Sequence, residues 1–418
     1  MHIILKERVN LMNILLQIVL IVYMIVLPLF PGTLNGEYQI IEMVQSALLL
    51  LLFIKHVAIK ENRKVLKDKL TRILKEPASY LSIMLLLLMM VSVLQSTSIF
   101  LSLKEIFRFG LALGLYLLVI LEFSTKKAIH RLIKMIYYPA FLVLLYGIFQ
   151  QFTGHGVSSY VNGVIPRIDS TFGQPNLYAG YIILLFYPLF FVAIKEKSKK
   201  LKYFYFLELL LMLVSIVYTY SRNGWLSLIL GCLIVSIIYN WKLLFPLIAM
   251  IIGAVAIPAV HERLNQFNGV FVNDGRVKIW KVAVKAIQDH PISGIGIGNF
   301  QPFNNEYIIQ HPEFNTGENI LHTHNVYLKM FAELGVVGFI VFLIFSVVII
   351  VKAVKVARNF DGELKNIATG IGVTFFTFYL VNMFDNLLFA SKIMNYYFIF
   401  IGILVTSIIN IKSNKFNS

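Results

Sequence analysis

Long apolar stretches separated by short polar segments run through almost the whole chain. Uncharged runs of about 18 residues or more recur, which is the length that an α-helix needs to cross the hydrocarbon core of a bilayer. The pattern predicts an all-α polytopic membrane protein with about twelve transmembrane helices. The predicted spans are residues 10–30, 40–54, 79–98, 107–123, 135–152, 176–194, 203–220, 224–240, 243–260, 334–351, 366–384 and 394–411. The second and the fourth are the weakest, because Glu42, Arg108 and Glu122 lie at their ends.

The composition agrees with this class. Hydrophobic residues make up 58% of the chain, against about 45–50% in soluble globular domains. The stretch from Leu11 to Phe30 is too long for a signal-peptide core and no small-residue cleavage site follows it, so we interpret it as the first membrane helix. The single cysteine, Cys232, excludes an intrachain disulfide and a cysteine-based metal site. Residues 1–418 are therefore predicted to form one integral membrane domain.

The net charge of +16 comes from basic residues that collect in alternate loops. If the N-terminus is cytoplasmic, the inner segments hold 26 of the 37 Lys and Arg residues, most densely at 55–75 and 195–202. Cytoplasmic loops of membrane proteins are enriched in these two residues. The distribution predicts that both termini are cytoplasmic, and it explains the positive charge without any binding of nucleic acid.

Two of the predicted outer loops are long, at about residues 153–175 and 261–333. The second is too long for a simple connection, which usually has about 4–6 residues, and too short for an independent domain. Within it, Asn273 or Asp274 can cap a helix that begins near Arg276 and stops at Pro291. Lysines fall on one face of this helix and apolar residues on the other, which predicts an amphipathic helix lying at the membrane interface. The apolar residues are Val277, Trp280, Ala283, Val284 and Ile287.

A glycine-rich segment, Gly294 to Gly298, follows this helix. It has no strand before it, so it is not the fingerprint of a dinucleotide site. We interpret it as a flexible turn that lets the loop fold back on the membrane.

Several polar residues near predicted span ends can carry chemistry. Arg222 lies between two spans that almost no loop separates; an arginine at membrane depth costs about 2.5–3.5 kcal/mol and by default faces an interior or a wet cavity. The alternative is that Arg222 is an interfacial anchor whose side chain extends its guanidinium group to water. Arg276 fits an anion ligand and a structural charge equally well. His324 suits proton transfer near neutral pH, although a lone histidine is most often simply solvated.

Two nearby positions have simpler interpretations. His322 and His324 form a His-x-His pair, but no third ligand has a suitable spacing, so no metal site is predicted. Glu333 is expected to pair with Lys329, which lies four residues before it on the same helix face.

Four motifs occur in a characteristic order. His324-Asn325 is followed after nine residues by Gly335-Val336-Val337-Gly338, and upstream lie Ser221-Arg222-Asn223-Gly224, Gly275-Arg276 and Phe172-Gly173-Gln174-Pro175-Asn176. They resemble the His-Asn-x9-Gly-x-x-Gly pattern, the Ser-Arg-Gly-type segment, the loop arginine and the Phe-Gly-Asn-Pro-Asn-like stretch of O-antigen ligases and related polysaccharide polymerases. The likeness is best over about residues 165–340. Asn223 departs from the family, which often has a second glycine there.

The resemblance implies a membrane glycosyltransferase of the bacterial plasma membrane, with a GT-C-like architecture and the large loop facing outside. Such enzymes transfer a glycan from an undecaprenyl-diphosphate carrier to an acceptor hydroxyl on a glycan or a lipid, without a cofactor or a metal. By this resemblance His324 is the catalytic base, and Arg222 and Arg276 bind the diphosphate. The residues expected to support them are Asn325, Gly335, Gly338, Asn176 and Asp274.

Three alternatives stay open at this level. The motifs do not separate a ligase from a polymerase, because the two share the donor and differ in the acceptor. A flippase or transporter of lipid-linked sugars also fits twelve helices, but transporters often consist of two similar halves, which this chain lacks. A metal-dependent transferase would need paired outer carboxylates, whereas Asp169, Asp274 and Glu318 are far apart in sequence.

Overall fold

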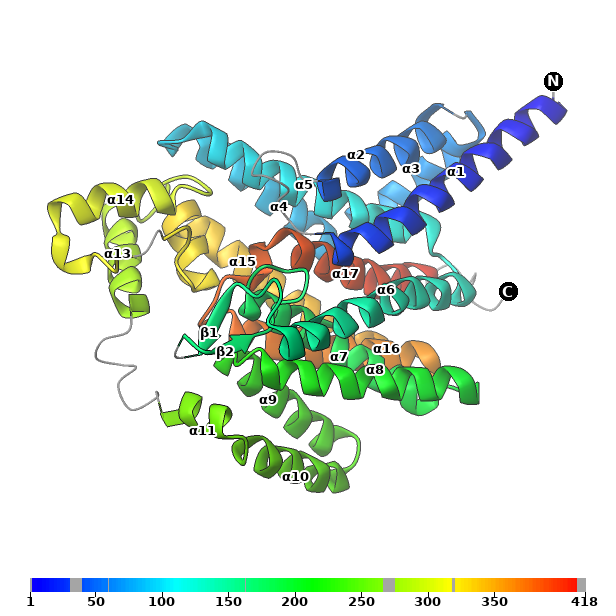
Figure 1. The fold of residues 1–418 in the computed structure, drawn as a ribbon. Coiled ribbons are helices and arrows are strands. Elements are labelled where there is room, and N and C mark those ends of the chain that lie inside the picture. Colours follow the sequence, from blue (N-terminus) through cyan, green and yellow to red (C-terminus); the bar gives the residue numbers. More distant parts are fainter. Residues whose placement is uncertain are drawn as a thin grey trace.

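The computed structural model describes residues 2–30, 40–58, 60–161, 163–265, 275–317 and 320–411, whose helices form one bundle (Figure 1). Its α-helices are α1 (His2–Leu29), α2 (Ile40–Phe53), α3 (Lys60–Leu74), α4 (Pro77–Ser92), α5 (Ile99–Glu122), α6 (Lys126–Thr153), α7 (Pro175–Lys195), α8 (Lys199–Tyr218), α9 (Arg222–Ile238), α10 (Leu244–Val255), α11 (Pro258–Asn265), α13 (Gly275–Asp289), α14 (Phe300–Gln310), α15 (Val326–Asn359), α16 (Glu363–Val381) and α17 (Ser391–Ile411). Shorter helical turns are η1 (Ile54–Ala58), η2 (Val93–Gln95), η3 (Trp241–Leu243), η5 (Pro312–Phe314) and η6 (Leu387–Phe389).

The helices confirm the predicted class of a polytopic helical membrane protein. Among the described residues, nine helices are long and apolar enough to cross a membrane, and α9 and α10 are apolar but shorter. The predicted total of twelve spans therefore stays a prediction. In the two weakest predicted spans, Arg108 Nε of α5 lies 3.5 Å from Glu42 Oε1 of α2. Two of the three charges that weaken the sequence signal thus pair with each other, and the third, Glu122, pairs with Lys55, whose Nζ lies 2.6 Å from its Oε2.

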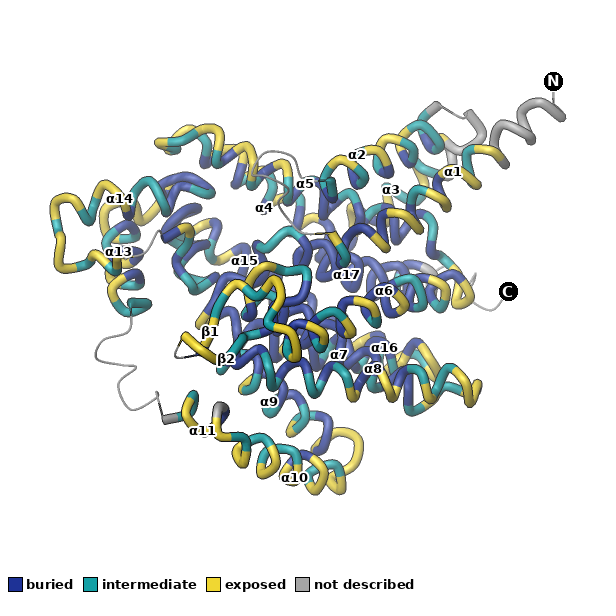
Figure 2. Tube along the Cα trace, in the orientation of Figure 1, coloured by how far each residue is buried: buried dark blue, intermediate teal, exposed yellow. Residues whose placement is uncertain are grey.

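The centre of the bundle is formed by α7 and α17, which are buried along most of their length (Figure 2). α7 packs along α16, and α17 packs along α5. Gly370 allows the first of these contacts, because a Cβ atom there would lie 2.5 Å from Pro188 Cα of α7. Small residues at such crossings let membrane helices approach closely. By contrast, peripheral helices turn apolar side chains outward, such as Ile252 of α10, as lipid-facing helices do.

One end of the bundle, here called the loop end, carries residues 154–161, 163–174, 256–265, 275–317 and 320–325, while α1 begins and α17 ends at the opposite end (Figure 1). The first of these loops contains a small hairpin, β1 (Ser159–Val161) paired antiparallel with β2 (Ile165–Arg167). This hairpin is a minor departure from the predicted all-α fold. The amide of Ile168 donates to the carbonyl of Tyr218 at 3.1 Å, which fastens the loop to the end of α8.

The predicted amphipathic helix exists as α13, but its predicted apolar face is partly wrong. Ala283 is buried, whereas Val284 is 43% exposed and Ile279 and Val282 are buried in its place. Ile279, Val282 and Ala283 pack against Phe300 of α14 in a small hydrophobic cluster. The helix therefore buries a face against its own loop, which the periodicity of α13 alone does not reveal.

The glycine-rich segment is a packed turn, so the prediction that it is flexible is wrong. α15 breaks at Gly335, whose φ of 68° is left-handed, and a Cβ atom there would overlap the carbonyl oxygen of Ile292. The break frees backbone carbonyls that the turn then satisfies. Ile295 and Gly296 donate to the carbonyls of Ala332 and Glu333 at 2.9 and 3.0 Å. The turn does fold the loop back onto the bundle, as predicted.

Candidate functional site

His324 lies two residues before α15, next to the residue that caps the start of this helix. Asn325 is the N-cap: its Oδ1 accepts the amide of Leu328 at 3.0 Å, which satisfies one of the free amides at a helix start. The amide of Val326 donates to the carbonyl of Asn382 at 2.9 Å. His324 itself has a φ of 49°, and its side chain is 29% exposed. Asn325 thus acts on the site by fixing the direction in which His324 leaves the helix.

Asp385 is the partner of His324 and was not found from the sequence. Its Oδ1 lies 3.5 Å from His324 Nδ1 and accepts the amide of Asn386 at 2.8 Å. Its Oδ2 accepts Nδ2 of Asn176 at 3.0 Å. Burial alone would raise the pKa of Asp385, but His324, the positive charge of Arg276 and the Asn386 amide outweigh it and lower the pKa below its ordinary value. The sequence signal is the polar pair Asp385-Asn386, which directly follows the predicted span 366–384.

His322 lies beside His324, with their ring centroids 4.5 Å apart. The pKa of His322 falls to about 3, chiefly because burial disfavours the imidazolium and secondarily because His324 and Lys329 lie close. His322 is therefore neutral near pH 7.

Four arginines gather at the loop end, and we call them the arginine cluster: Arg167, Arg222, Arg263 and Arg276. They come from β2, the start of α9, α11 and the first turn of α13. The pKa of Arg167 falls to about 10, first through burial and then through the other three charges. Burial, Arg222 and Arg276 likewise lower the pKa of Arg263. Such crowding of like charge is costly, and a bound anion would relieve it.

The arginine cluster adjoins the His324–Asp385 pair. Nδ2 of Asn223, the residue after Arg222, donates to the carbonyl of Phe384 at 3.3 Å. The ring of Trp280, one turn after Arg276, lies with its centroid 6.2 Å from that of Phe384. The segment next to Asp385 therefore meets both arginine-bearing helices, as a shared site for Arg222, Arg276 and His324 requires.

The predicted supporting glycines and the outer carboxylates remain to be placed. Gly335 makes the break in α15, and a Cβ atom at Gly338 would collide with Leu334 in the preceding turn. Asp274 lies outside the described residues, and so does Glu318. Of the other outer carboxylates, Asp169 accepts Gln150 Nε2 at 2.9 Å and the amide of Ser158 at 3.0 Å, so it braces the first loop.

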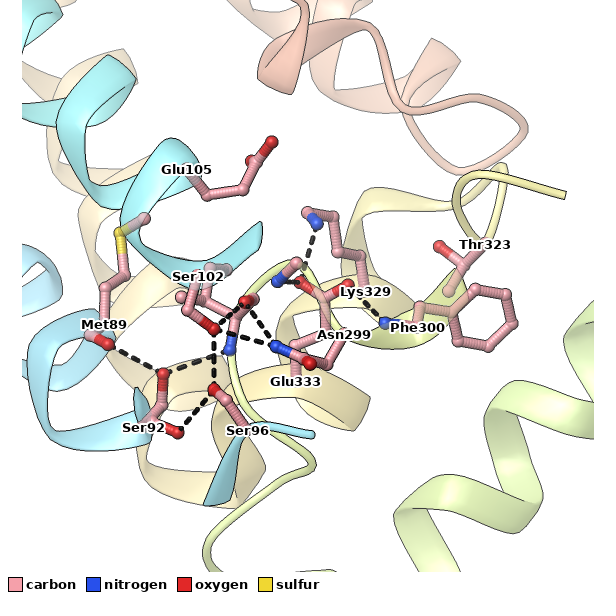
Figure 3. A network of polar contacts seen from close by, with 12 residues as sticks. Met89, Ser92, Ser96, Ser102, Glu105, Asn299, Phe300, Thr323, Lys329 and Glu333 are labelled. Atoms are coloured by element: carbon pink, nitrogen blue, oxygen red, sulfur yellow. Dashed lines mark hydrogen bonds and ion pairs between the residues drawn. The ribbon is translucent and has the colours of Figure 1, made fainter. Parts of the chain in front are cut away.

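A buried polar network supports the start of α15 (Figure 3). The predicted pair is confirmed: Lys329 Nζ lies 2.6 Å from Glu333 Oε2. Glu333 also accepts the amides of Gly298 at 2.8 Å and Phe300 at 3.4 Å. Asn299 Nδ2 donates to Ser102 Oγ of α5 at 2.8 Å. The network joins the glycine turn, α5 and the helix that follows His324.

Replacing Lys329 with methionine is expected to lower the free energy of unfolding by about 3–5 kcal/mol, because it leaves the Glu333 carboxylate buried without its charge partner. A second change, Glu333→Leu, should recover only part of this loss, since it orphans the two amides that Glu333 accepts. Tryptophan fluorescence during SDS-induced unfolding measures the effect. Lys285→Met is the control, because Lys285 pairs with Asp289 on an exposed face and should change nothing measurable. Equal stability of the Lys329 variant and this control would contradict the role of the network.

The fold and the site define an integral membrane protein with a cationic and histidine-bearing centre at one end of its helical bundle. Residues 207–343 match a model of the O-antigen ligase family (Wzy_C). No curated protein matches the chain. The match supports the resemblance to O-antigen ligases and polysaccharide polymerases that the motifs predicted, and that family implies a glycosyltransferase-type membrane enzyme of polysaccharide biosynthesis. The matched region contains Arg222, Arg276 and His324, whereas Asn176 and Asp385 lie outside it.

Proposed function

We propose that this protein transfers a glycan from undecaprenyl diphosphate to an acceptor hydroxyl at the outer face of the plasma membrane, as an O-antigen ligase or a polysaccharide polymerase. The observation that carries the proposal is the arginine cluster beside the His324–Asp385 pair. The reaction expels a lipid diphosphate and deprotonates an alcohol, so it needs anion-binding groups and a base side by side.

In this proposal the arginine cluster binds the diphosphate. Arg222 and Arg276 offer planar guanidinium groups that hold phosphate oxygens by paired, charge-assisted hydrogen bonds. As the bond between the sugar carbon and the diphosphate oxygen breaks, its electron pair stays on the diphosphate. Arginines placed beforehand stabilise that charge without reorganising. Arg167 and Arg263 add to the positive field from the hairpin and α11.

His324 is the proposed base. Its Nδ1 faces Asp385, so a proton on Nδ1 would point to this carboxylate and leave Nε2 free for the acceptor. The acceptor oxygen forms the new bond to the sugar carbon while its proton passes to Nε2. Asn176 and the Asn386 amide hold Asp385 in place, which makes these two residues positioning groups and not reactants.

An apolar cavity beside the arginine cluster supports a lipid-linked donor, because it can hold the carrier lipid. An apolar cavity of about 650 Å³ lies between α7, α8, α9 and α10. Tyr218 and Ile257 line it, and both belong to the hydrophobic cluster that packs the hairpin and α11 together. Arg167 Nε donates to the carbonyl of Thr219, next to Tyr218, at 3.0 Å. An isoprenoid chain in this cavity would bring its diphosphate to the arginine cluster.

The proposal also sets the orientation: the loop end faces outside and both termini are cytoplasmic, as the charge distribution predicts. Labelling with a membrane-impermeant maleimide tests this, starting from a Cys232→Ser background. A cysteine replacing Lys278 on exposed α13 should react in intact cells, and one replacing Lys200 only after permeabilisation. The reverse pattern would refute the orientation.

Reconstitution of the purified protein with an undecaprenyl-diphosphate glycan and an acceptor tests the transfer reaction. We expect a glycan product and the release of one undecaprenyl diphosphate for every glycosidic bond formed, resolved by gel electrophoresis and mass spectrometry. A ladder of lengths identifies a polymerase, and a single addition identifies a ligase. Movement of the intact donor across the bilayer with no product would replace the proposal by the transporter alternative.

A further inference from the structure

Three side chains at the site have the composition and spacing of a metal-binding set. His322, His324 and Asp385 each offer one ligand atom, and these atoms all lie within 4.8 Å of one another. The sequence supplies only the His-x-His pair. The third ligand comes from the turn after α16, 61 positions further along the chain than His324, so the fold completes a set that spacing alone leaves incomplete.

The two imidazoles have coordination capacity that the protein leaves unused. Nδ1 of His322 and Nδ1 of His324 are buried, and neither has a hydrogen-bond partner among the described residues. The 3.5 Å separation between His324 Nδ1 and Asp385 Oδ1 is longer than a good hydrogen bond. In the tautomer whose proton lies on Nε2, such a buried Nδ1 atom has a lone pair without a donor, which is unfavourable, and a bound cation would satisfy it.

We propose that His322, His324 and Asp385 bind a divalent transition-metal ion, Zn²⁺ above all, and that the bound ion inhibits the transferase. Two imidazole nitrogens and a carboxylate oxygen form a usual ligand set for Zn²⁺, with bonds of about 2.0–2.2 Å and a fourth position for water. Binding an ion at bonds of this length requires the three side chains to rotate toward a common centre from their present spacing. The binding stands on the geometry alone, and the inhibition rests on the proposed function.

Inhibition follows from the role proposed for His324. When a metal ion occupies Nδ1 of a neutral imidazole, the remaining proton lies on Nε2, so this nitrogen has no lone pair with which to accept the acceptor's proton. The ion also removes Asp385 from its orienting role. The same cluster can thus serve as the base when free of metal and as an inhibitory site when metal is bound.

Zinc titration of the purified full chain, first cleared of metal with EDTA, tests the binding with a chromophoric competitor as the readout. We expect one Zn²⁺ per chain, and an affinity lower by at least about tenfold in His322→Gln and in Asp385→Asn, since even indirect ligand supports are worth about 10–100-fold. His130→Gln is the matched control, because His130 contacts a single carboxylate, that of Glu363, and should leave the affinity unchanged. Absence of stoichiometric binding, or binding that survives both ligand variants, would overturn the site.

The transfer assay tests the inhibition separately. Zn²⁺ should stop product formation and EDTA should restore it, while His322→Gln should retain transfer and resist the ion. Stimulation by Zn²⁺, or loss of activity in EDTA, would overturn the inhibitory role and make the metal part of the chemistry. Absence of transfer in the metal-free protein, with zinc binding intact, would refute the proposed function and leave the site standing.

Discussion

Replacing His324 with alanine is expected to lower the rate of glycan transfer by about 10²–10⁴-fold, the usual contribution of a positioned general base. The protein should still reach the membrane and fold, because the residues that cap α15 and fasten its start, Asn325 and Val326, remain. The donor should bind as before, since the arginine cluster is untouched. The loss should therefore appear in kcat and not in the KM for the donor.

Two further variants sharpen this test. His290→Ala, at an exposed position after α13, is the matched control and should transfer at the normal rate. Asp385→Asn should lower kcat less than His324→Ala does, because it removes the group that orients the base and keeps the base itself. Normal product from the His324 variant, in the protein as purified, would refute its role.

Replacing Arg222 or Arg276 with glutamine should lower kcat/KM by about 10²–10³-fold, comparable to removing a donor from a site that stabilises developing negative charge. The change removes both a charge and a planar pair of hydrogen-bond donors. Lysine at the same position should restore part of the activity, since it keeps the charge and loses the paired geometry. Steady-state kinetics over a range of donor concentrations measures the effect.

The arginine prediction has a control on the same helix. Lys281 is an exposed residue of α13, and Lys281→Gln changes the net charge as Arg276→Gln does. It should leave the kinetics unchanged. If the Lys281 and Arg276 variants lose activity equally, the effect is a general one of surface charge, and the assignment of Arg276 to the diphosphate is wrong.

The motifs point to some members of the proposed site and miss others, for a physical reason. Arg222, Arg276 and His324 stand in local patterns that a reader of the sequence can recognise. Asp385 and Arg263 have no such pattern and enter the site only because α16 and α11 end beside it. Asn325 and Gly335 were expected to support the site, and the structure gives each a local cause: one caps α15, and the other permits its break.

The sequence by itself determined the class of protein, because the length and hydropathy that a helix needs to span a bilayer are local properties of each segment. It also determined the pairing of Lys329 with Glu333, because two residues four positions apart lie side by side on the surface of one helix. Only the tertiary structure decided which face α13 buries, that the glycine turn is packed against the break in α15, and that Asp385 meets His324. These depend on contacts between segments far apart in the chain, and no local pattern of hydrophobic and polar residues encodes which segments will meet.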